Sequence, residues 1–426
     1  MQLRSPLLAT SLALAIASLA ACSSTQPPAA SAAPAPVAAA PAPAAAPITQ
    51  SNAAQAASAA YDFDMDVFHP VVGRSGMVAS EQELASRIGL QILKSGGNAV
   101  DAAVAMGFAL AVALPNAGNI GGGGFMVVHD AKSGKNIALD FREVAPSKAT
   151  RDMYVGADGK VIDGKSLYTH YAVGVPGTVA GMEHALKKWG SLPLSTVIAP
   201  AAKLADKGFT VSETLAKILE QEKKNMGQWP ATQAIFWRNG EPLKRGDRLV
   251  QKDLAQSLRL IGQQGSKVFY EGSIARKIAA EMAPHAGALS LQDLKSYKVA
   301  EREPLRGTYR GYEIVTMPPP SSGGAHLIQI LNMMERWPMN QWGVNSAQSI
   351  HYMAESMKLA YADRAEYLGD PDFVSVPLKG LTSKRYAEAL AAGIDPYQAR
   401  AGKDIRPGKP QPYDCLLYTS PSPRDS

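Results

Sequence analysis

The sequence predicts an α/β fold built in layers, and three observations predict it. Several stretches repeat apolar residues at the three- and four-residue spacing of helices. Two short stretches, 125–128 and 137–141, are apolar at consecutive positions, as strands are when both faces are covered. The 426-residue chain is 46% hydrophobic and 19% charged, which is ordinary for a globular protein with a sizeable core. Buried strands with helices packed around them are therefore the predicted architecture.

The amino terminus predicts a segment that precedes this fold. Arg4 stands before an apolar run that ends in Leu19-Ala-Ala-Cys22, and the whole resembles a bacterial lipoprotein signal. In such signals the cysteine is acylated and becomes the first residue. We expect residues 1–21 to be a signal peptide and Cys22 to carry a lipid anchor. The protein would then lie in the cell envelope or periplasm, with the outer membrane favoured. A plain secretory peptide is the alternative.

Composition and charge set the domain limits and exclude some partners. Residues 22–60 are mostly Ala, Pro, Ser and Gln, so they cannot bury a core and predict a disordered spacer. No second low-complexity stretch follows, and we expect one domain over 61–414. The net charge of +6 is spread along the chain, so no nucleic-acid partner is expected. Besides Cys22 there is only Cys415, which rules out a disulfide framework within the chain.

Helix start signals are clear near the beginning of the domain. Ser80 and Glu83 form a predicted capping box for the first helix. Asn98 is predicted to cap the second, residues 99–114, which is apolar on all sides except Asp101 and should be buried between layers. The two apolar stretches form a predicted hairpin. Further helices are predicted over 178–189, 195–207, 212–225, 251–264, 272–283, 325–335 and 346–367, and a strand over 309–317.

Four consecutive glycines, Gly121 to Gly124, lie between the second helix and the first strand. Phosphate-binding loops run in the opposite order, from strand to helix, and no Gly-Lys-Ser/Thr follows here, so no nucleotide site is expected. Glycines in such numbers mark a close approach of backbones. Two interpretations stay open. The run either packs the helix end against the strand or forms a backbone wall of a ligand pocket.

Motifs of metal enzymes and serine hydrolases are missing from the sequence, which has no His-Glu-x-x-His, Gly-x-Ser-x-Gly or Ser-x-x-Lys. His351 and Glu355, one helical turn apart, are interpreted as a surface pair rather than half of a metal site. Neither a metal nor a cofactor is expected.

For two polar pairs later in the chain, a structural role is favoured over a functional one. Ser321 and Ser322 precede a predicted helix, and capping of that helix is favoured over anion binding. Asp363 and Arg364 are interpreted as an internal ion pair rather than a catalytic pair.

Among single residues, Arg142 has the most specific functional hypothesis, which is binding of a carboxylate. It follows the second apolar strand, and its planar guanidinium matches the two oxygens of a carboxylate. An ion pair with Asp140, Glu143 or another acid is the structural alternative. The residues alone leave both interpretations open.

Eight short segments, in order, resemble those of the γ-glutamyltransferase (γ-glutamyltranspeptidase) family of N-terminal-nucleophile hydrolases. They are Gly76-Met-Val-Ala-Ser80, Gly96-Gly-Asn-Ala-Val-Asp-Ala102, Gly118-Asn-Ile-Gly-Gly-Gly-Gly124, Leu139-Asp-Phe-Arg-Glu143, Val175-Pro-Gly177, Gly307-Thr-Tyr-Arg-Gly311, Pro318 to Gly324, and Tyr361-Ala-Asp-Arg364.

This resemblance implies an αββα sandwich, made as a precursor that cleaves itself into a large and a small subunit. The new N-terminal threonine of the small subunit attacks the γ-glutamyl bond of glutathione and related amides. The acyl group then passes to water or to an amino acid or peptide acceptor, and no cofactor is needed. In the family, the arginine of the Asp-Phe-Arg-Glu segment, here Arg142, binds the α-carboxylate of the γ-glutamyl group.

The sequence departs from the family after Asp414. Thr419 lacks the flanking residues of the family's cleavage site, so the nucleophile is not identified in this chain. One back-translation of Cys415 to Ser420 matches a transposase-type sequencing adapter, and we interpret 415–426 as a non-native tail. The chain as written would then be the large-subunit part, inactive without its small subunit.

Two other functions are weighed beside this one. A glutaryl-type (cephalosporin) acylase of the same fold shares the need to bind a carboxylate, but its substrate has no α-amino group. A non-catalytic binding lipoprotein would keep the pocket and have no nucleophile at all.

Overall fold

The structure is a computed structural model and describes residues 72–414. From Gly73 onward the described residues belong to one compact unit. The predicted signal peptide, the spacer with Cys22, and the tail with Cys415 and Thr419 lie outside the described residues. Within the described range, no helix combines the length and the apolar character that a membrane crossing needs.

Helix α3 (Ala99–Ala113) lies at the centre of the larger hydrophobic core, as the sequence predicts. It is apolar around its whole circumference and packs against α2 (Glu83–Lys94), α5 (Thr178–Trp189) and α6 (Leu194–Lys207). A helix with no polar face can be stable only when neighbours cover every side. The fold supplies those neighbours from segments that flank α3 on both sides in sequence.

The single carboxylate of α3 is fully satisfied. Asn98 caps the helix in a capping box with Asp101, as predicted. Asp101 is completely buried and accepts backbone N–H bonds from Asn98 at 2.8 Å, Ser191 at 2.9 Å and Leu192 at 3.1 Å. The Ser191 hydroxyl donates a fourth bond at 2.6 Å. Asp101 thus joins the start of α3 to the turn before α6.

The predicted capping box of Ser80 and Glu83 is wrong. Helix α2 begins at Glu83, so this residue stands in the first position rather than the third. The N-cap is Gln82, whose side chain accepts the N–H of Leu84 at 2.5 Å. The Ser80 hydroxyl instead donates to the Gln82 carbonyl at 2.9 Å. The side chain of Gln82, two residues further along, therefore makes the capping contact that the sequence pattern assigns to Ser80.

A three-stranded antiparallel sheet lies beside these helices. Strands β1 (Phe125–Asp130) and β2 (Lys135–Asp140) form the predicted hairpin. Strand β7 (Ala300–Arg302), from much later in the chain, pairs with the other edge of β2. The sequence did not predict β7, because three residues give too short a pattern.

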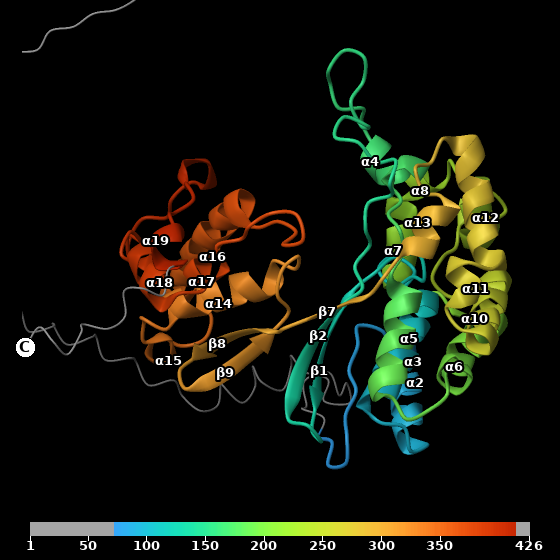
Figure 1. Cartoon of the computed structure of the whole chain (residues 1–426), viewed down its shortest axis with the longest axis horizontal. Coiled ribbons are helices and arrows are strands. Elements are labelled where there is room, and N and C mark those ends of the chain that lie inside the picture. The colour runs from blue at the N-terminus through green and yellow to red at the C-terminus, as the bar shows by residue number, and fades with distance from the viewer. Residues whose placement is uncertain (1–71, 415–426) are drawn as a thin grey trace, which may run out of the picture. The chain divides into compact units, whose positions relative to one another are not determined.

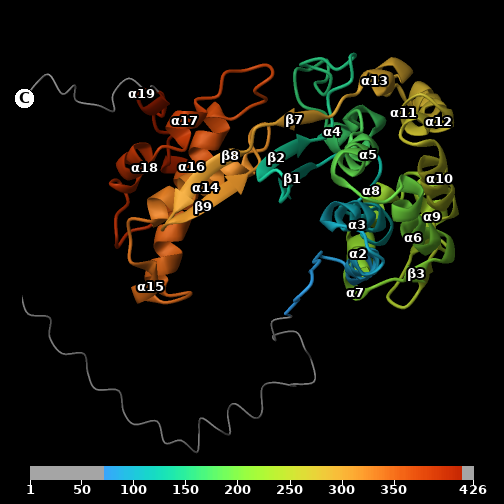
Figure 2. The same ribbon diagram turned by 60° about the horizontal axis from the view of Figure 1, so that its bottom comes forward.

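The helical core covers one face of this sheet and leaves the other face open. Met126 and Leu139 are register partners and pack into the helical core. Successive side chains of a strand point to opposite faces. On the other face, Val127 is 42% exposed. The prediction that both faces are covered is therefore wrong for the described residues, since helices cover one face only (Figures 1 and 2).

Three more predicted helices are present in this part. They are α10 (Lys252–Gln264), α12 (Ser273–Met282) and the predicted helix 212–225, which breaks at Glu222 into α7 (Glu213–Gln221) and α8 (Lys223–Met226). The sequence did not predict the short helices α4 (Lys165–Tyr168), η2 (His170–Ala172), α9 (Pro230–Phe236), α11 (Lys267–Tyr270), η3 (Ala283–His285) and α13 (Leu291–Ser296). Two-residue strands pair as β3 (Phe209–Thr210) with β6 (Arg248–Leu249), and β4 (Trp237–Arg238) with β5 (Glu241–Pro242).

A second, smaller core forms after β7. Its central helix α14 (Gly323–Met334) packs on α16 (Ala347–Tyr367) and α18 (Lys384–Ala391). The short elements nearby are α15 (Met339–Trp342), α17 (Leu378–Leu381), η4 (Gly402–Asp404) and α19 (Gln411–Asp414).

The strand predicted over 309–317 is instead the second half of a hairpin. Strands β8 (Leu305–Tyr309) and β9 (Tyr312–Thr316) pair in antiparallel register, and α14 packs on β8. Arg310 and Gly311 form the turn with φ of 48° and 87°. Two consecutive positive φ values are what a type I′ hairpin turn needs.

Helix α16 buries two carboxylates and exposes a stripe of apolar side chains. Glu355 and Asp363 are each only 1% exposed. The opposite face carries exposed apolar side chains at helical spacing: Ile350, Met353, Met357 and Tyr361. Among the described residues, nothing covers this stripe.

Candidate active site

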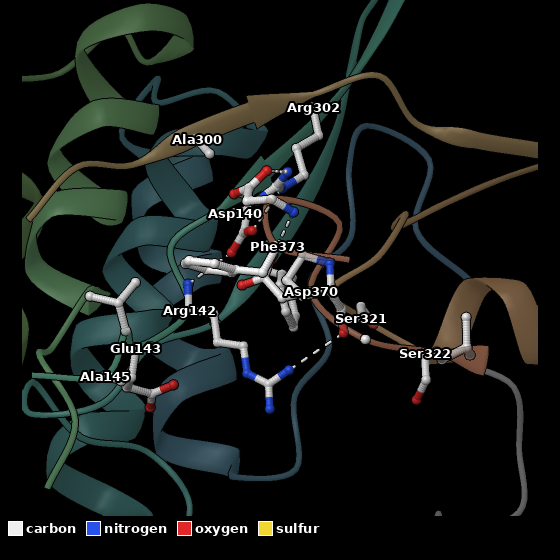
Figure 3. Close-up of a pocket in the computed structure, with 18 of the residues that line it drawn as sticks. Asp140, Arg142, Glu143, Ala145, Ala300, Arg302, Ser321, Ser322, Asp370 and Phe373 are labelled. Atoms are coloured by element: carbon white, nitrogen blue, oxygen red, sulfur yellow. Dashed lines mark hydrogen bonds and ion pairs between the residues drawn. The ribbon is translucent and has the colours of Figure 1, made fainter. Parts of the chain in front are cut away.

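An open pocket of about 1160 Å³ lies on the uncovered face of the β1–β2–β7 sheet (Figure 3). Phe125, Asp140 and Ala300 occupy paired positions on that face and form part of the wall. Small-ligand pockets usually measure about 300–1,000 Å³. The larger volume fits a pocket that is wide open on one side.

The glycine run serves both of the purposes left open by the sequence. A Cβ atom on Gly123 would lie 2.6 Å from the Phe141 carbonyl oxygen and 2.7 Å from the Glu143 nitrogen. No side chain fits there, so the run packs directly on the backbone that carries Arg142. Gly123 and Gly124 also line the pocket. The run is therefore a close-packed support and a backbone wall at once.

Arg142 follows β2 and reaches into the pocket with an exposed side chain. Its Nη1 atom lies 3.5 Å from the Pro320 carbonyl oxygen, at the outer limit of a hydrogen bond. Across residues 72–414, its guanidinium has no ion pair with a carboxylate. Figure 3 shows the guanidinium pointing away from Asp140. The charge is thus available to a ligand.

Asp140, the acid proposed as a structural partner of Arg142, is engaged elsewhere. Its Oδ2 atom accepts from Arg302 Nε at 2.8 Å, and its Oδ1 atom accepts the backbone N–H of Arg142 at 3.0 Å. Arg302 also donates two hydrogen bonds to Asp372, at 3.0 and 2.8 Å. Hydrogen bonds to Asp372 and to Asp140 raise the pKa of Arg302 above its ordinary value. Asp140 therefore holds the backbone of Arg142 and leaves its side chain free.

Tyr297 provides a second support for the same backbone. Its hydroxyl donates to the Arg142 carbonyl at 2.9 Å, and its ring stacks on Tyr270 at 5.7 Å. Burial raises the pKa of the Tyr297 hydroxyl, so it remains a donor at neutral pH. The Tyr270 hydroxyl in turn donates to the Pro176 carbonyl at 2.9 Å. Arg142 is thus fixed from both sides of its peptide unit.

A family model described as gamma-glutamyltranspeptidase matches residues 85–421. The chain belongs to this family. It is similar to the glutathione hydrolase proenzyme of Escherichia coli (strain K12), with 51% identity over 368 residues, which cover 86% of this chain and 63% of that relative. It is also similar to the acylase ACY 1 proenzyme of Pseudomonas sp. (strain V22), with 40% identity over 78% of this chain and 60% of the acylase.

A solved structure agrees with this assignment. The crystal structure of Helicobacter pylori gamma-glutamyltranspeptidase matches with a TM-score of 0.77 and 45% identity, covering 82% of this chain and 99% of that chain. The predicted fold class, an α/β N-terminal-nucleophile hydrolase fold, is confirmed. The chain spans less than two thirds of the length of the E. coli relative.

Two sequence interpretations near the pocket need correction. The Ser321 hydroxyl accepts the N–H of Gly323, the first residue of α14, at 3.4 Å, but Ser322, the N-cap residue, makes no capping hydrogen bond. Its hydroxyl instead accepts from Arg364 Nε at 3.2 Å. Asp363 and Arg364 form no ion pair in the described structure, because adjacent residues of a helix point in different directions. Asp363 is buried, whereas Arg364 is exposed and lines the pocket.

Sequence reasoning missed the pocket residues Tyr297, Arg302 and Arg364. Arg364 brings a third guanidinium to the pocket, on the wall that holds Ser321 and Ser322. The segment Tyr361 to Arg364 is one of those that resemble the family, and this was the one available signal that Arg364 belongs to the site. The interpretation of Asp363 and Arg364 as an ion pair concealed that signal.

The interpretation of His351 and Glu355 as a surface pair is also wrong. His351 Nε2 lies 2.7 Å from the Asp395 carbonyl oxygen. Glu355 is buried and bonded to Lys358 and to Arg400, whose Nε donates at 2.8 Å. Both residues serve the packing of the smaller core.

Proposed function

We propose that this chain is part of a γ-glutamyltransferase that cleaves the γ-glutamyl bond of glutathione and related amides. One observation carries the proposal: the guanidinium of Arg142 stands in an open pocket without a carboxylate partner among the described residues. A planar guanidinium of this kind suits the α-carboxylate of a γ-glutamyl group, because two parallel hydrogen bonds fix its position.

The pocket wall formed by the described residues contains no threonine and no cysteine. Its side-chain hydroxyls belong to Ser321, Ser322 and Tyr297. We assign the attack to the hydroxyl of the N-terminal threonine that the family resemblance implies, which lies outside this wall. In the proposed reaction, Arg142 holds the α-carboxylate while that hydroxyl adds to the γ-carbonyl. The amine leaves with a proton, and water or an acceptor amine then releases the acyl group.

A small subunit is the proposed partner of the described fold. Two surfaces support it, namely the uncovered face of the sheet at Val127 and the apolar stripe on α16. Contiguous exposed apolar surface of this kind marks an interaction site. A segment that packs on the sheet face would also close the pocket and bring the nucleophile toward Arg142. The described chain alone is accordingly proposed to be inactive.

Lipid attachment at Cys22 and residence in the periplasm, on the outer membrane, complete the proposal. Their support is the sequence of the first 22 residues. Growth with a radiolabelled fatty acid should label the protein, and Cys22→Ala should abolish the label. Equal labelling of the variant would contradict this anchor.

The acylase of Pseudomonas sp. (strain V22) keeps the glutaryl-type acylase as a second candidate. Hydrolysis of γ-glutamyl-p-nitroanilide and glutaryl-p-nitroanilide by the complete protein encoded at this locus separates the two functions, because only the former substrate carries an α-amino group. We expect kcat/KM to favour the γ-glutamyl substrate by about 100-fold, the value of a hydrogen-bonded charged group. A preference for the glutaryl substrate would support the acylase, and turnover of neither would leave the binding lipoprotein.

A further inference from the structure

Two histidines and a glutamate that do not line the pocket converge in the helical part of the fold. They are His170 in η2, Glu281 in α12 and His285 in η3. The Nε2 atom of His170 lies 3.3 Å from Glu281 Oε1, and the Nε2 atom of His285 lies 3.5 Å from the same oxygen. One ligand atom from each of the three residues lies within 4.8 Å of the other two.

The two nitrogen-to-oxygen separations match the spacing of ligand atoms around a zinc-like ion. Zinc binds histidine nitrogen at about 2.0–2.1 Å and carboxylate oxygen at about 2.0–2.2 Å, so tetrahedral ligand atoms lie roughly 3.3–3.5 Å apart. The two nitrogen-to-oxygen distances, 3.3 and 3.5 Å, already fall in that range. Two imidazoles and one carboxylate leave a fourth position for water.

Three aromatic rings pack together at this place. The His170 and His285 rings stack with centroids 4.1 Å apart and planes at 13°. An imidazole nitrogen binds a metal ion in the plane of its ring, so one of these nearly parallel rings would have to turn for both to bind one ion, and the His285 side chain, 42% exposed, has room to do so. The Trp229 ring packs edge-on at 4.9 Å from His170 and 5.9 Å from His285. An ion bound there would lie close to one tryptophan.

The backbone holds the two histidines in this position. Glu281 and His285 are one helical turn apart, which puts them on one face. After His285 the chain turns back through Ala286, with φ of 54°, and Gly287. A Cβ atom on Gly287 would come within 3.3 Å of the His170 Cβ and 2.5 Å of Met282 Sδ. The tight turn therefore seats η3 directly against η2.

We propose that His170, Glu281 and His285 form a binding site for a divalent late-transition-metal ion, of which Zn²⁺ is the type. The ion would join η2 to the end of α12, segments more than a hundred residues apart in sequence. Such a site stabilises the folded chain because the unfolded chain does not present the three ligands together. It is independent of the γ-glutamyl chemistry proposed for the pocket.

Titration of the tag-free full chain, with its cysteine thiols blocked by N-ethylmaleimide, tests the site. Calorimetry with Zn²⁺ should give one saturable site per chain. Cu²⁺ should quench tryptophan fluorescence with the same stoichiometry, and Trp229→Phe should remove most of that quenching while leaving Zn²⁺ affinity unchanged. No saturable binding of either ion would overturn the proposal.

Ligand variants decide whether these three residues are responsible. His170→Ala and His285→Ala should each weaken Zn²⁺ binding by about tenfold or more, since even outer-shell changes cost that much. His129→Ala is the matched control, because His129 is an exposed histidine whose ring shares a hydrogen bond with Asn136, far in sequence from the three ligands, and it should bind like the wild type. His285→Gln, with folding checked by circular dichroism, repeats the test with a polar side chain. Unchanged affinity in the folded His285 variants would contradict the site.

Discussion

Helices α3 and α16 differ in which side chains they bury and which they expose. In α3 the apolar residues are inside, and the one buried carboxylate, Asp101, has four hydrogen bonds. In α16 two carboxylates are inside, and apolar side chains such as Met357, 41% exposed, face outward. The first arrangement is complete within the described residues. The second leaves an exposed apolar stripe of the kind that marks an interaction site.

This difference indicates where the described fold is finished and where it awaits a partner. The region around α3 has a packed core within the described residues. The region around α16, with the pocket and the open sheet face, presents apolar surface and a free guanidinium together. The same kind of substitution should therefore change stability by very different amounts in the two helices.

The largest expected effect comes from placing a charge on α3. Ala109 has no exposed surface. Ala109→Glu would bury a carboxylate without a partner and should lower the free energy of unfolding by about 4 kcal/mol or more, or prevent folding. Urea unfolding followed by circular dichroism measures it. A change of less than about 1 kcal/mol would show that α3 is not the rigid centre described here.

Removing a buried carboxylate from α16 should come next. Glu355→Ala leaves the Lys358 ammonium and the Arg400 guanidinium without their buried partner. Breaking a buried pair from one side costs about 3–5 kcal/mol. The same urea experiment checks this value. A neutral result would mean that the inner face of α16 is open to water.

Asp101→Asn should have a smaller effect that depends on pH. Burial alone would raise the pKa of Asp101, but hydrogen bonds from Ser191, Asn98 and Leu192 lower it below the ordinary value. A depressed folded-state pKa adds stability above the unfolded pKa of about 3.9, and this stability is lost as pH falls below it. The variant should cost about 1–3 kcal/mol at pH 7 and lose less stability than the wild type between pH 5 and 3. Parallel pH profiles would contradict this assignment.

The smallest effect on stability should come from the outer face of α16. Met357→Glu introduces the same side chain as the α3 variant at an exposed position. It should change the free energy of unfolding by no more than about 0.5 kcal/mol. It should also reduce self-association of this chain in sedimentation experiments, because it interrupts the apolar stripe. A loss as large as that of Ala109→Glu would remove the contrast between the helices.

Local patterns predicted the fold best where neighbours in sequence decide the structure. The cap at Asn98, the hairpin of β1 and β2, and α5 with its bounds at Thr178 and Trp189 were all correct. Each depends on residues a few positions apart. The sequence analysis missed strand β8, which precedes Arg310, and chose the wrong cap at Ser80. Both errors arise where two local patterns compete.

Contacts between distant segments were beyond the sequence. Arg142 lines the pocket, but the freedom of its guanidinium depends on Arg302, which binds Asp140 from 162 residues away. Tyr297 supports the same peptide unit from 155 residues away. The two histidines of the proposed metal site are likewise brought together only by the fold. The spacing of Glu281 and His285 was the single hint available.

The central claim is that the Arg142 guanidinium binds the α-carboxylate of a γ-glutamyl substrate. The most direct test compares the complete protein with its Arg142→Gln variant on two anilides. γ-Glutamyl-p-nitroanilide carries the α-carboxylate, and 4-aminobutyryl-p-nitroanilide keeps the amine without it. We expect the variant to lose about 100- to 1,000-fold in kcat/KM on the first substrate, the value of two charge-assisted hydrogen bonds, and no more than about threefold on the second. Equal losses on both substrates, or no loss on either, would contradict the claim.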